Sequence, residues 1–138
     1  MRQVRQVISL RTPEQGFTEI TGEIAAWLRE EGVADGMLNV FIRHTSATLT
    51  IQENADPSVQ DDLVTALDAF APRERAYRHS TEGPDDMPAH IRTMVTDVSL
   101  NIPVGDGAML LGTWQGVYVI EHRDRPHTRQ VVLTYQGT

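Results

Sequence analysis

The chain has 138 residues, 40% of them hydrophobic and 22% charged, which is the composition of one ordinary globular domain over residues 1–138. Its formal net charge of −7 argues against a nucleic-acid partner, because such binding requires a basic surface. The absence of cysteine excludes disulfides and thiolate metal sites and fits a cytoplasmic protein, and no apolar run reaches the ~20 residues of a membrane span.

The first predicted elements are a strand and a helix. Loose alternation of apolar residues predicts a strand over residues 3–10. Apolar residues at positions i, i+4, i+7 and i+8 predict a helix over residues 18–31 with one apolar face. We expect Thr18 to cap the start of this helix and Gly32 to end it.

Two strands and a second helix follow. A two-residue period predicts a strand over residues 37–44 and places His44 at the end of its core-facing row. A further short strand is expected over residues 45–53. Asp56 as N-cap, followed by proline at the first helical position, predicts a helix over residues 56–70. The apolar stripe of this helix, which we expect to be buried, consists of Val59, Leu63, Leu67 and Phe70.

The C-terminal half is predicted to be rich in strands. A short helix is expected to begin near Pro88, and strands are expected over residues 98–104, 107–112, 116–122 and 129–137. The order of elements indicates an α+β fold with a mostly antiparallel β-sheet or sandwich, two longer helices and one short helix.

The segment "YRHSTEGPDDMPAHI" over residues 77–91 places metal- and proton-binding side chains on one short loop. Its prolines restrict φ, so the acids beside them have reduced backbone freedom. A structural interpretation stays open, because an aspartate before a helix usually caps it and a loop histidine is usually exposed. The side chains concerned are His79, Glu82, Asp85, Asp86 and His90.

Two further histidines, His44 and His122, each end an apolar strand row, which suggests that they converge with those of the loop. If His79, His90 and His122 meet, three imidazoles with an open position suit Zn²⁺. If carboxylates dominate instead, Mg²⁺ is the better assignment. We therefore expect a divalent metal as cofactor, zinc rather than magnesium.

A phosphate site is expected beside this metal. Arg123 and Arg129 can hold phosphate oxygens in a two-point fork, although arginines at strand ends are often only solvated. The hydroxyls of Ser46 and Thr48 can bind phosphate oxygens or serve as turn residues. Gln115 can hydrogen-bond to a substrate or cap its own turn.

Four segments together resemble the YjbQ-like family, also called the secondary thiamine-phosphate synthase family. They are "HTSATLTIQENADPSVQDDL", "YRHSTEGPDDMPAHI", "LGTWQGVYVIEHR" and "RQVVLTYQG", and the resemblance runs from about residue 5 to the C-terminus. It implies a single α+β domain that assembles as a homotrimer, with a polar site near subunit contacts and often a bound metal. It also implies a weak thiamine-phosphate synthase activity, which joins a pyrimidine diphosphate to a thiazole phosphate and releases pyrophosphate.

The polar positions of the family are all present in this chain, Asp62 among them. Carried over residue by residue, they assign catalysis to His44, Asp86 and Glu121. Substrate and phosphate binding is assigned to Ser46, Asn54, Gln115, Arg123 and Arg129, and Thr48 is added to them for its hydroxyl and not as a family position. Metal binding is assigned to His79, His90 and His122.

Two functions follow from these assignments. The first is a metal-assisted enzyme acting on a small phosphorylated metabolite, as a transferase of the synthase type or as a phosphate-ester hydrolase, with His44 moving a proton. The alternative is a non-catalytic trimer that binds a metal or an anionic metabolite and needs no proton carrier.

Overall fold

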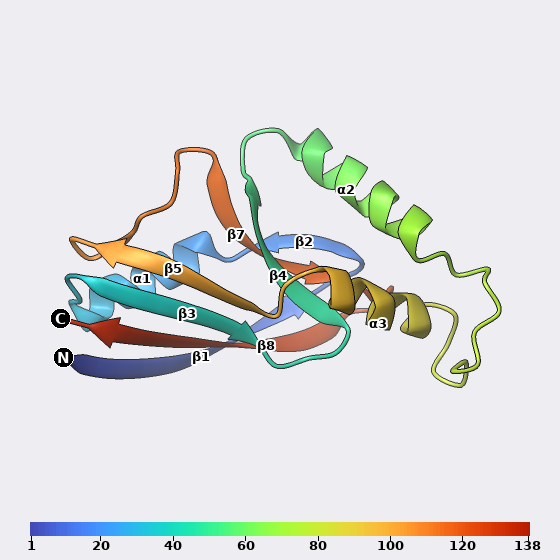
Figure 1. Ribbon diagram of the computed structural model, residues 1–138, viewed down its shortest axis with the longest axis horizontal. Coiled ribbons are helices and arrows are strands. Elements are labelled where there is room, and N and C mark those ends of the chain that lie inside the picture. Colours follow the sequence, from blue (N-terminus) through green and yellow to red (C-terminus); the bar gives the residue numbers. More distant parts are fainter.

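The computed structural model describes residues 1–138 and contains two antiparallel β-sheets and three helices (Figure 1). The predicted α+β class is confirmed. The larger sheet has the order β1-β8-β3-β5-β6 and is formed by Arg2–Thr12, His127–Gly137, Gly36–Ile42, Ser99–Gly105 and Ala108–Met109. The smaller sheet has the order β2-β7-β4 and is formed by Gly16–Glu19, Gln115–Glu121 and Ala47–Glu53.

Apolar residues with a two-residue period build the core from both sheets. In β3, Leu38, Val40 and Ile42 are buried, as the alternation predicted. In β8, Val131 and Leu133 are buried in the same way. One cluster of 17 buried residues includes side chains from both sheets and from the first helix, so the chain has a single hydrophobic core.

Helix α1 (Thr21–Glu31) packs on this core and ends at Gly32, as predicted. Gly32 adopts the left-handed conformation with φ 62° and donates its N–H to Arg29 O. The prediction that Thr18 caps the helix is wrong, because Thr18 lies in β2 and pairs with Val119 of β7. The Thr21 hydroxyl instead accepts a hydrogen bond from the backbone of β7.

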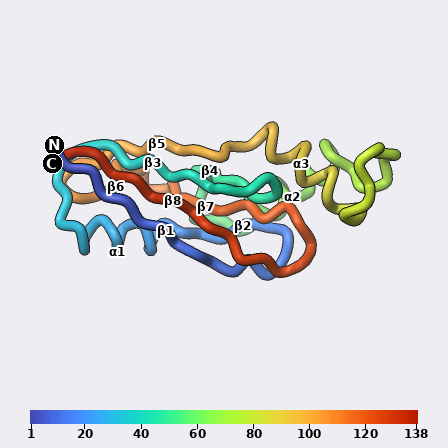
Figure 2. The backbone as a smooth tube through the Cα atoms, turned by 90° about the horizontal axis from the view of Figure 1, so that it is seen from below, coloured from blue at the N-terminus to red at the C-terminus, as the bar shows by residue number.

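Helix α2 (Pro57–Phe70) starts as predicted, with the Asp56 carboxylate accepting a hydrogen bond from Ser58 N at 2.9 Å. The prediction that its apolar stripe is buried is wrong. No residue of α2 is buried, and Phe70 is 56% exposed. The reason is that α2 and α3 extend past one end of the sheets, while both termini lie at the other end (Figure 2).

Helix α3 (Asp86–Val95) begins two residues before its predicted start. Its Arg92 is buried and donates hydrogen bonds to Leu67 O at 3.3 Å, Ala71 O at 3.1 Å and the Asp68 carboxylate at 2.9 Å. One side chain of α3 therefore holds the last turn of α2, and the segment between the two helices is closed into a loop.

Of the other strands, β2 was not predicted, β6 has only two residues, and the rest lie near their predicted positions. The strand expected over residues 107–112 stops early because Gly112 and Gln115 form a turn with two mutual hydrogen bonds. None of the three helices has the length and hydropathy that crossing a bilayer requires.

Candidate metal centre

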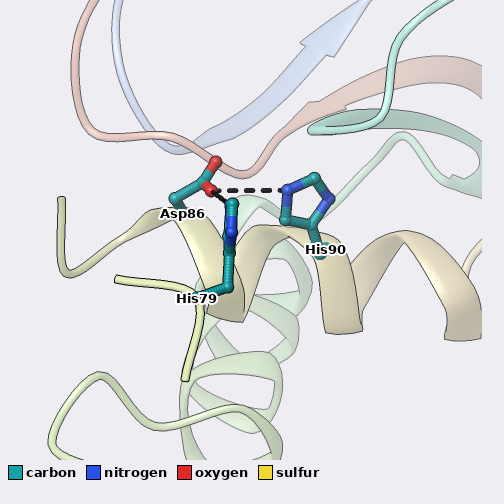
Figure 3. Close-up of side chains that lie close together, drawn as sticks. All are labelled: His79, Asp86 and His90. Atoms are coloured by element: carbon teal, nitrogen blue, oxygen red, sulfur yellow. Dashed lines mark hydrogen bonds and ion pairs between the residues drawn. The ribbon is translucent and has the colours of Figure 1, made fainter. Parts of the chain in front are cut away.

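Three side chains from the loop and from α3 converge on one point (Figure 3). His79 Nε2 lies 2.9 Å from Asp86 Oδ2, and His90 Nε2 lies 3.4 Å from the same oxygen. Asp86 and His90 are separated by four residues on α3, so they lie on one face of the helix. His79 reaches them from the loop that precedes α3, as Figure 3 shows. Each of the three therefore offers a donor atom, all within 4.8 Å of one another.

Arg123 fixes the orientation of the Asp86 carboxylate. Its Nη1 donates to Asp86 Oδ1 at 2.9 Å, its Nε donates to Asp85 Oδ2 at 2.9 Å, and its Nη2 donates to Glu82 O at 3.0 Å. Asp85 also accepts a hydrogen bond from Asp124 N. Oδ1 of Asp86 is thereby occupied on the side away from the imidazoles, and Oδ2 is left facing them.

The electrostatics of this arrangement agree with the geometry. Burial alone would raise the pKa of Asp85, but the hydrogen bonds from Arg123 and from Asp124 N outweigh burial and lower it. The hydrogen bond to Asp85 raises the pKa of Arg123. The Arg123 guanidinium and the Asp85 carboxylate are therefore both charged at neutral pH and hold each other in place.

The donor set fits a divalent metal. Two imidazole nitrogens and one carboxylate oxygen are the ligands of many catalytic zinc sites, which keep a further position open. Ligands about 2.0–2.1 Å from a tetrahedral zinc lie about 3.3 Å from one another. The two distances to Asp86 Oδ2 are 2.9 and 3.4 Å, and all three donor atoms lie within 4.8 Å of one another. The side chains of His79 and His90 are 53% and 36% exposed, so a ligand can reach the site. The hydrogen bond from Arg123 is the outer support that metal-binding carboxylates usually have.

His122 lies outside this group of three. It is buried, its Nε2 lies 2.8 Å from the Thr48 hydroxyl, and its Nδ1 has no hydrogen-bond partner. Burial lowers the pKa of His122 to about 4, so it is neutral at physiological pH. We expected His122 as the third metal ligand and Asp86 as a catalytic residue. In the structure, Asp86 lies with His79 and His90 in place of His122.

Glu121 and Arg129 form a buried ion pair at the ends of β7 and β8. Nε and Nη2 of Arg129 donate to the two carboxylate oxygens of Glu121, which also accept from the Thr12 hydroxyl and from Arg123 N. Burial favours a raised pKa for Glu121, but the hydrogen bonds from Arg129 and Thr12 prevail and lower it. Arg129 Nη2 also donates to Ser46 Oγ at 2.9 Å, so these groups bind one another.

His44 is half-buried next to this network. Its Nε2 accepts a hydrogen bond from Gln130 N at 2.8 Å, so the ring proton is on Nδ1. Burial first, and the positive charge of Arg129 second, lower the pKa of His44. The neutral ring can therefore donate a hydrogen bond outward, while its basic nitrogen is already in use.

Asn54 and Gln115 lie at the opposite end of the smaller sheet. Ala47 of β4 pairs with Glu121 of β7 at one end of the ladder, and Glu53 pairs with Gln115 at the other. Six residue steps separate the two ends, which is roughly 20 Å along a strand. Both side chains are exposed, and Gln115 Oε1 accepts from Gly112 N. Within one chain, the structure does not bring these two residues to the loop. The remaining family position, Asp62, is exposed on α2.

Sequence reasoning missed two residues that hold the site. Asp85 was considered as a metal- or proton-binding side chain or as a helix cap, yet its side chain caps nothing and instead binds Arg123 and Asp124 N. Thr12 gave no signal, because its hydroxyl meets Glu121 only through the pairing of Thr12 with His127 between β1 and β8.

Known proteins similar to this chain share nearly its whole length. Residues 6–138 match the family described as UPF0047 protein YjbQ-like. UPF0047 protein sll1880 of Synechocystis is 47% identical over 99% of this chain and 93% of its own, and UPF0047 protein YjbQ of Salmonella typhimurium is 42% identical over 96% and 97%.

Solved structures show the same fold. A crystal structure of a yjbq/upf0047 family protein from Clostridium acetobutylicum has a TM-score of 0.88 at 39% identity and covers 95% of this chain and 99% of that one. A YbjQ-like protein of unknown function from Sulfolobus solfataricus has the same TM-score at 18% identity, covering 99% and 100%. The resemblance seen in the four sequence segments is confirmed, and the chain belongs to the YjbQ-like UPF0047 family.

Proposed function

We propose that this protein binds a divalent metal, zinc rather than magnesium, and uses it to act on a small phosphorylated metabolite. The observation that carries the proposal is the convergence of His79 Nε2, Asp86 Oδ2 and His90 Nε2 within 4.8 Å on an accessible surface. Two nitrogen ligands favour zinc, because magnesium prefers oxygen ligands and retained waters.

The chain's own residues have distinct roles in this proposal. His79 and His90 present their Nε2 atoms, and Arg123 holds the Asp86 carboxylate toward them. When bound, the metal supplies positive charge that polarises a phosphoryl oxygen or activates water. The exposed side of the two imidazoles leaves room for the phosphate of a ligand. As the resemblance implies, we include weak thiamine-phosphate synthase activity and phosphate-ester hydrolysis among the reactions to be tested.

A second candidate function is non-catalytic binding of a metal or an anionic metabolite. It is favoured by the hydrogen bond from Gln130 N to His44 Nε2, which leaves the expected proton carrier without a free basic nitrogen. In an enzyme, His44 would serve as a hydrogen-bond donor through Nδ1–H. In a binding protein, it would only fix the end of β8.

We further propose a cytoplasmic homotrimer. The trimer is what the family resemblance implies, and large apolar side chains exposed on α2, α3 and β3 are available for its subunit contacts. They include Phe41, Phe70, Met94 and Val95, which are 41%, 56%, 88% and 53% exposed. Sedimentation equilibrium measures the assembly directly, and a monomer at micromolar concentration would contradict it.

Elemental analysis of protein purified without added metal tests the proposed centre. We expect about one zinc per chain in the wild type and less than a tenth of that in His90→Ala, because two ligands rarely retain zinc. His127→Ala is the matched control, since His127 is a half-buried histidine outside the group of three. A metal-free wild type, or equal zinc in wild type and His90→Ala, would contradict the proposal.

Turnover of His44→Gln separates the two candidate functions. If the protein is an enzyme, this variant should retain its zinc and lose at least about tenfold in kcat. The assay uses zinc-loaded protein with the pyrimidine diphosphate and thiazole phosphate pair, and with simple phosphate monoesters. No turnover of any of these by the wild type would favour the binding function.

A further inference from the structure

A cavity of about 360 Å³ adjoins the candidate metal centre and shares His79 with it. The segment that joins α2 to α3, together with the first turn of α3, forms its entire wall. Polar side chains that line it are Arg73, Arg75, Tyr77, His79 and Ser80, and Met87 contributes an apolar surface. A ligand in this cavity would therefore lie directly beside one of the imidazoles of the centre.

No acidic residue lines this cavity, although the chain carries a net charge of −7. A second cavity, of about 410 Å³, is lined by other residues of the same loop and contains Glu82 and Asp85 beside Arg123. The Asp85 carboxylate already binds Arg123, and the Glu82 carboxylate would repel an anion. Of the two, only the cavity beside His79 has no carboxylate in its wall, and Arg75 supplies a positive charge there that no ion pair offsets, so an anion is the ligand it favours.

The hydrogen-bonding capacity of this cavity resides mainly in Arg75. Arg75 is exposed and forms no hydrogen bond or ion pair within the chain, so all five of its N–H groups are available. The Ser80 hydroxyl is likewise without a partner. Arg73 pairs through both terminal nitrogens with Asp124, and Tyr77 donates to Pro72 O. Arg73 and Tyr77 thus shape the wall, and Arg75 and Ser80 are left to bind a ligand.

We propose that this cavity binds the phosphate group of a small phosphorylated metabolite, and that Arg75 is the residue that recognises it. A guanidinium matches the oxygens of a phosphate in a two-point fork. The cavity volume is at the lower end of the range for small-molecule sites, which suits a compact phosphate monoester with a small apolar part against Met87. This inference rests on the proposed function, because the phosphate would lie beside His79 of the proposed metal centre.

This assignment differs from the one expected from the sequence. Phosphate binding was expected at Arg123 and Arg129, and both are held by carboxylates in the structure. Releasing either guanidinium would leave a buried or half-buried acid without its partner, which is costly. Arg75 needs no such rearrangement, because it has no partner to lose.

Binding of inorganic phosphate, measured by calorimetric titration, tests the inference on both metal-free and zinc-loaded protein. We expect Arg75→Gln to weaken phosphate binding by about tenfold or more, the effect of losing a charged hydrogen-bond donor. Arg75→Lys should bind with intermediate affinity, because a lysine keeps the charge without the fork. Arg78→Gln is the matched control, since Arg78 is exposed on the same loop but does not line the cavity. It should change the affinity by no more than about twofold.

The outcomes separate this inference from the proposed metal centre. If Arg75→Gln keeps its zinc and binds phosphate like the wild type, the anion site is overturned while the metal centre stands. If Arg75→Gln and Arg78→Gln lose affinity equally, phosphate senses only the general charge of the loop, and the site is again overturned. If the wild type binds no zinc but metal-free protein binds phosphate through Arg75, the metal centre fails and the anion site stands.

Discussion

Two regions of this molecule contain the same kinds of side chain and use them in opposite ways. The group of His79, Asp86 and His90 is partly exposed, and its nitrogen and oxygen atoms point at one another. The Glu121–Arg129 network is buried, and its hydrogen bonds run from one of its own members to another. Residue type alone does not distinguish them. The difference lies in whether donor atoms converge on an accessible point or are consumed within the fold.

The comparison implies that changes in the buried region reduce stability and leave metal content intact. The largest effect should come from Arg129→Met, because it leaves Glu121 buried without its partner. We expect a loss of about 3–5 kcal/mol in the free energy of unfolding, measured by urea denaturation. Arg11→Met, at an exposed site on β1, is the control. A loss below about 1 kcal/mol would mean that the pair is not structural.

Lowering the pH should also decrease the free energy of unfolding, because of His122. Its pKa is about 4 in the folded state and near 6.5 in an unfolded chain, so between these values only the unfolded state takes up the proton. The free energy of unfolding should therefore decrease as pH falls from 6.5 to 4, by about 3 kcal/mol from this group.

Urea denaturation at pH 7 and pH 4.5 checks the contribution of His122. His122→Asn should show a flatter dependence on pH than the wild type. The lowered pKa values of Asp85 and Glu121 place the titration of these two carboxyl groups at more acidic pH, while His44, whose pKa is also lowered, adds to the pH dependence of both proteins. Equal slopes in wild type and His122→Asn would show that the ring is not buried in the neutral form.

In the exposed region, the corresponding prediction concerns affinity for metal. Arg123→Gln removes the hydrogen bond that holds Asp86 Oδ1, and we expect zinc affinity to fall by about 10- to 100-fold. Competition with a chromophoric chelator measures it. Arg125→Gln, two residues along the chain and exposed, should bind zinc like the wild type. Unchanged zinc affinity in Arg123→Gln would mean that the Asp86 carboxylate does not need Arg123 to hold its orientation.

The smallest predicted effect is that of Thr12→Val, which removes one buried hydroxyl from the Glu121 network. Glu121 keeps both hydrogen bonds from Arg129, so the loss should be about 1 kcal/mol. Thermal or urea unfolding detects it, with Thr128→Val at an exposed position of β8 as the control. A loss as large as that of Arg129→Met would show that Thr12, rather than the ion pair, holds the network.

Local patterns in the sequence predicted most of the fold. The two-residue period placed Leu38, Val40 and Ile42 in the core, and Asp56 was recognised as a helix cap. The predictions for individual residues were wrong where long-range packing between elements determines their position. Thr18 lies in a strand because it pairs with β7. Phe70 is exposed because α2 extends past the end of the sheets. Helical periodicity shows which face is apolar, but it does not show what covers that face.

The same limit applies to the candidate site. His79 and His90 were predicted as metal ligands on one short loop, within twelve residues of sequence. Asp86 was assigned to catalysis instead, and the helix was expected to begin near Pro88, so the face that Asp86 shares with His90 was not predicted. The positions of His122 and Gln115 were not predicted either, because they depend on which end of the β4–β7 ladder each occupies. Strand register is set by long-range pairing, which one sequence does not reveal.

The contact between Arg92 and α2 has a further consequence, for the electrostatics of the helix ends. The last turn of α2 contains no basic residue, so nothing within the helix offsets the partial negative charge of its terminal carbonyl groups. Arg92 of α3 supplies that charge by binding the carbonyls of Leu67 and Ala71. The macrodipole of one helix is thus neutralised by the other, and in hydrogen exchange the amides of both should open together as one cooperative unit.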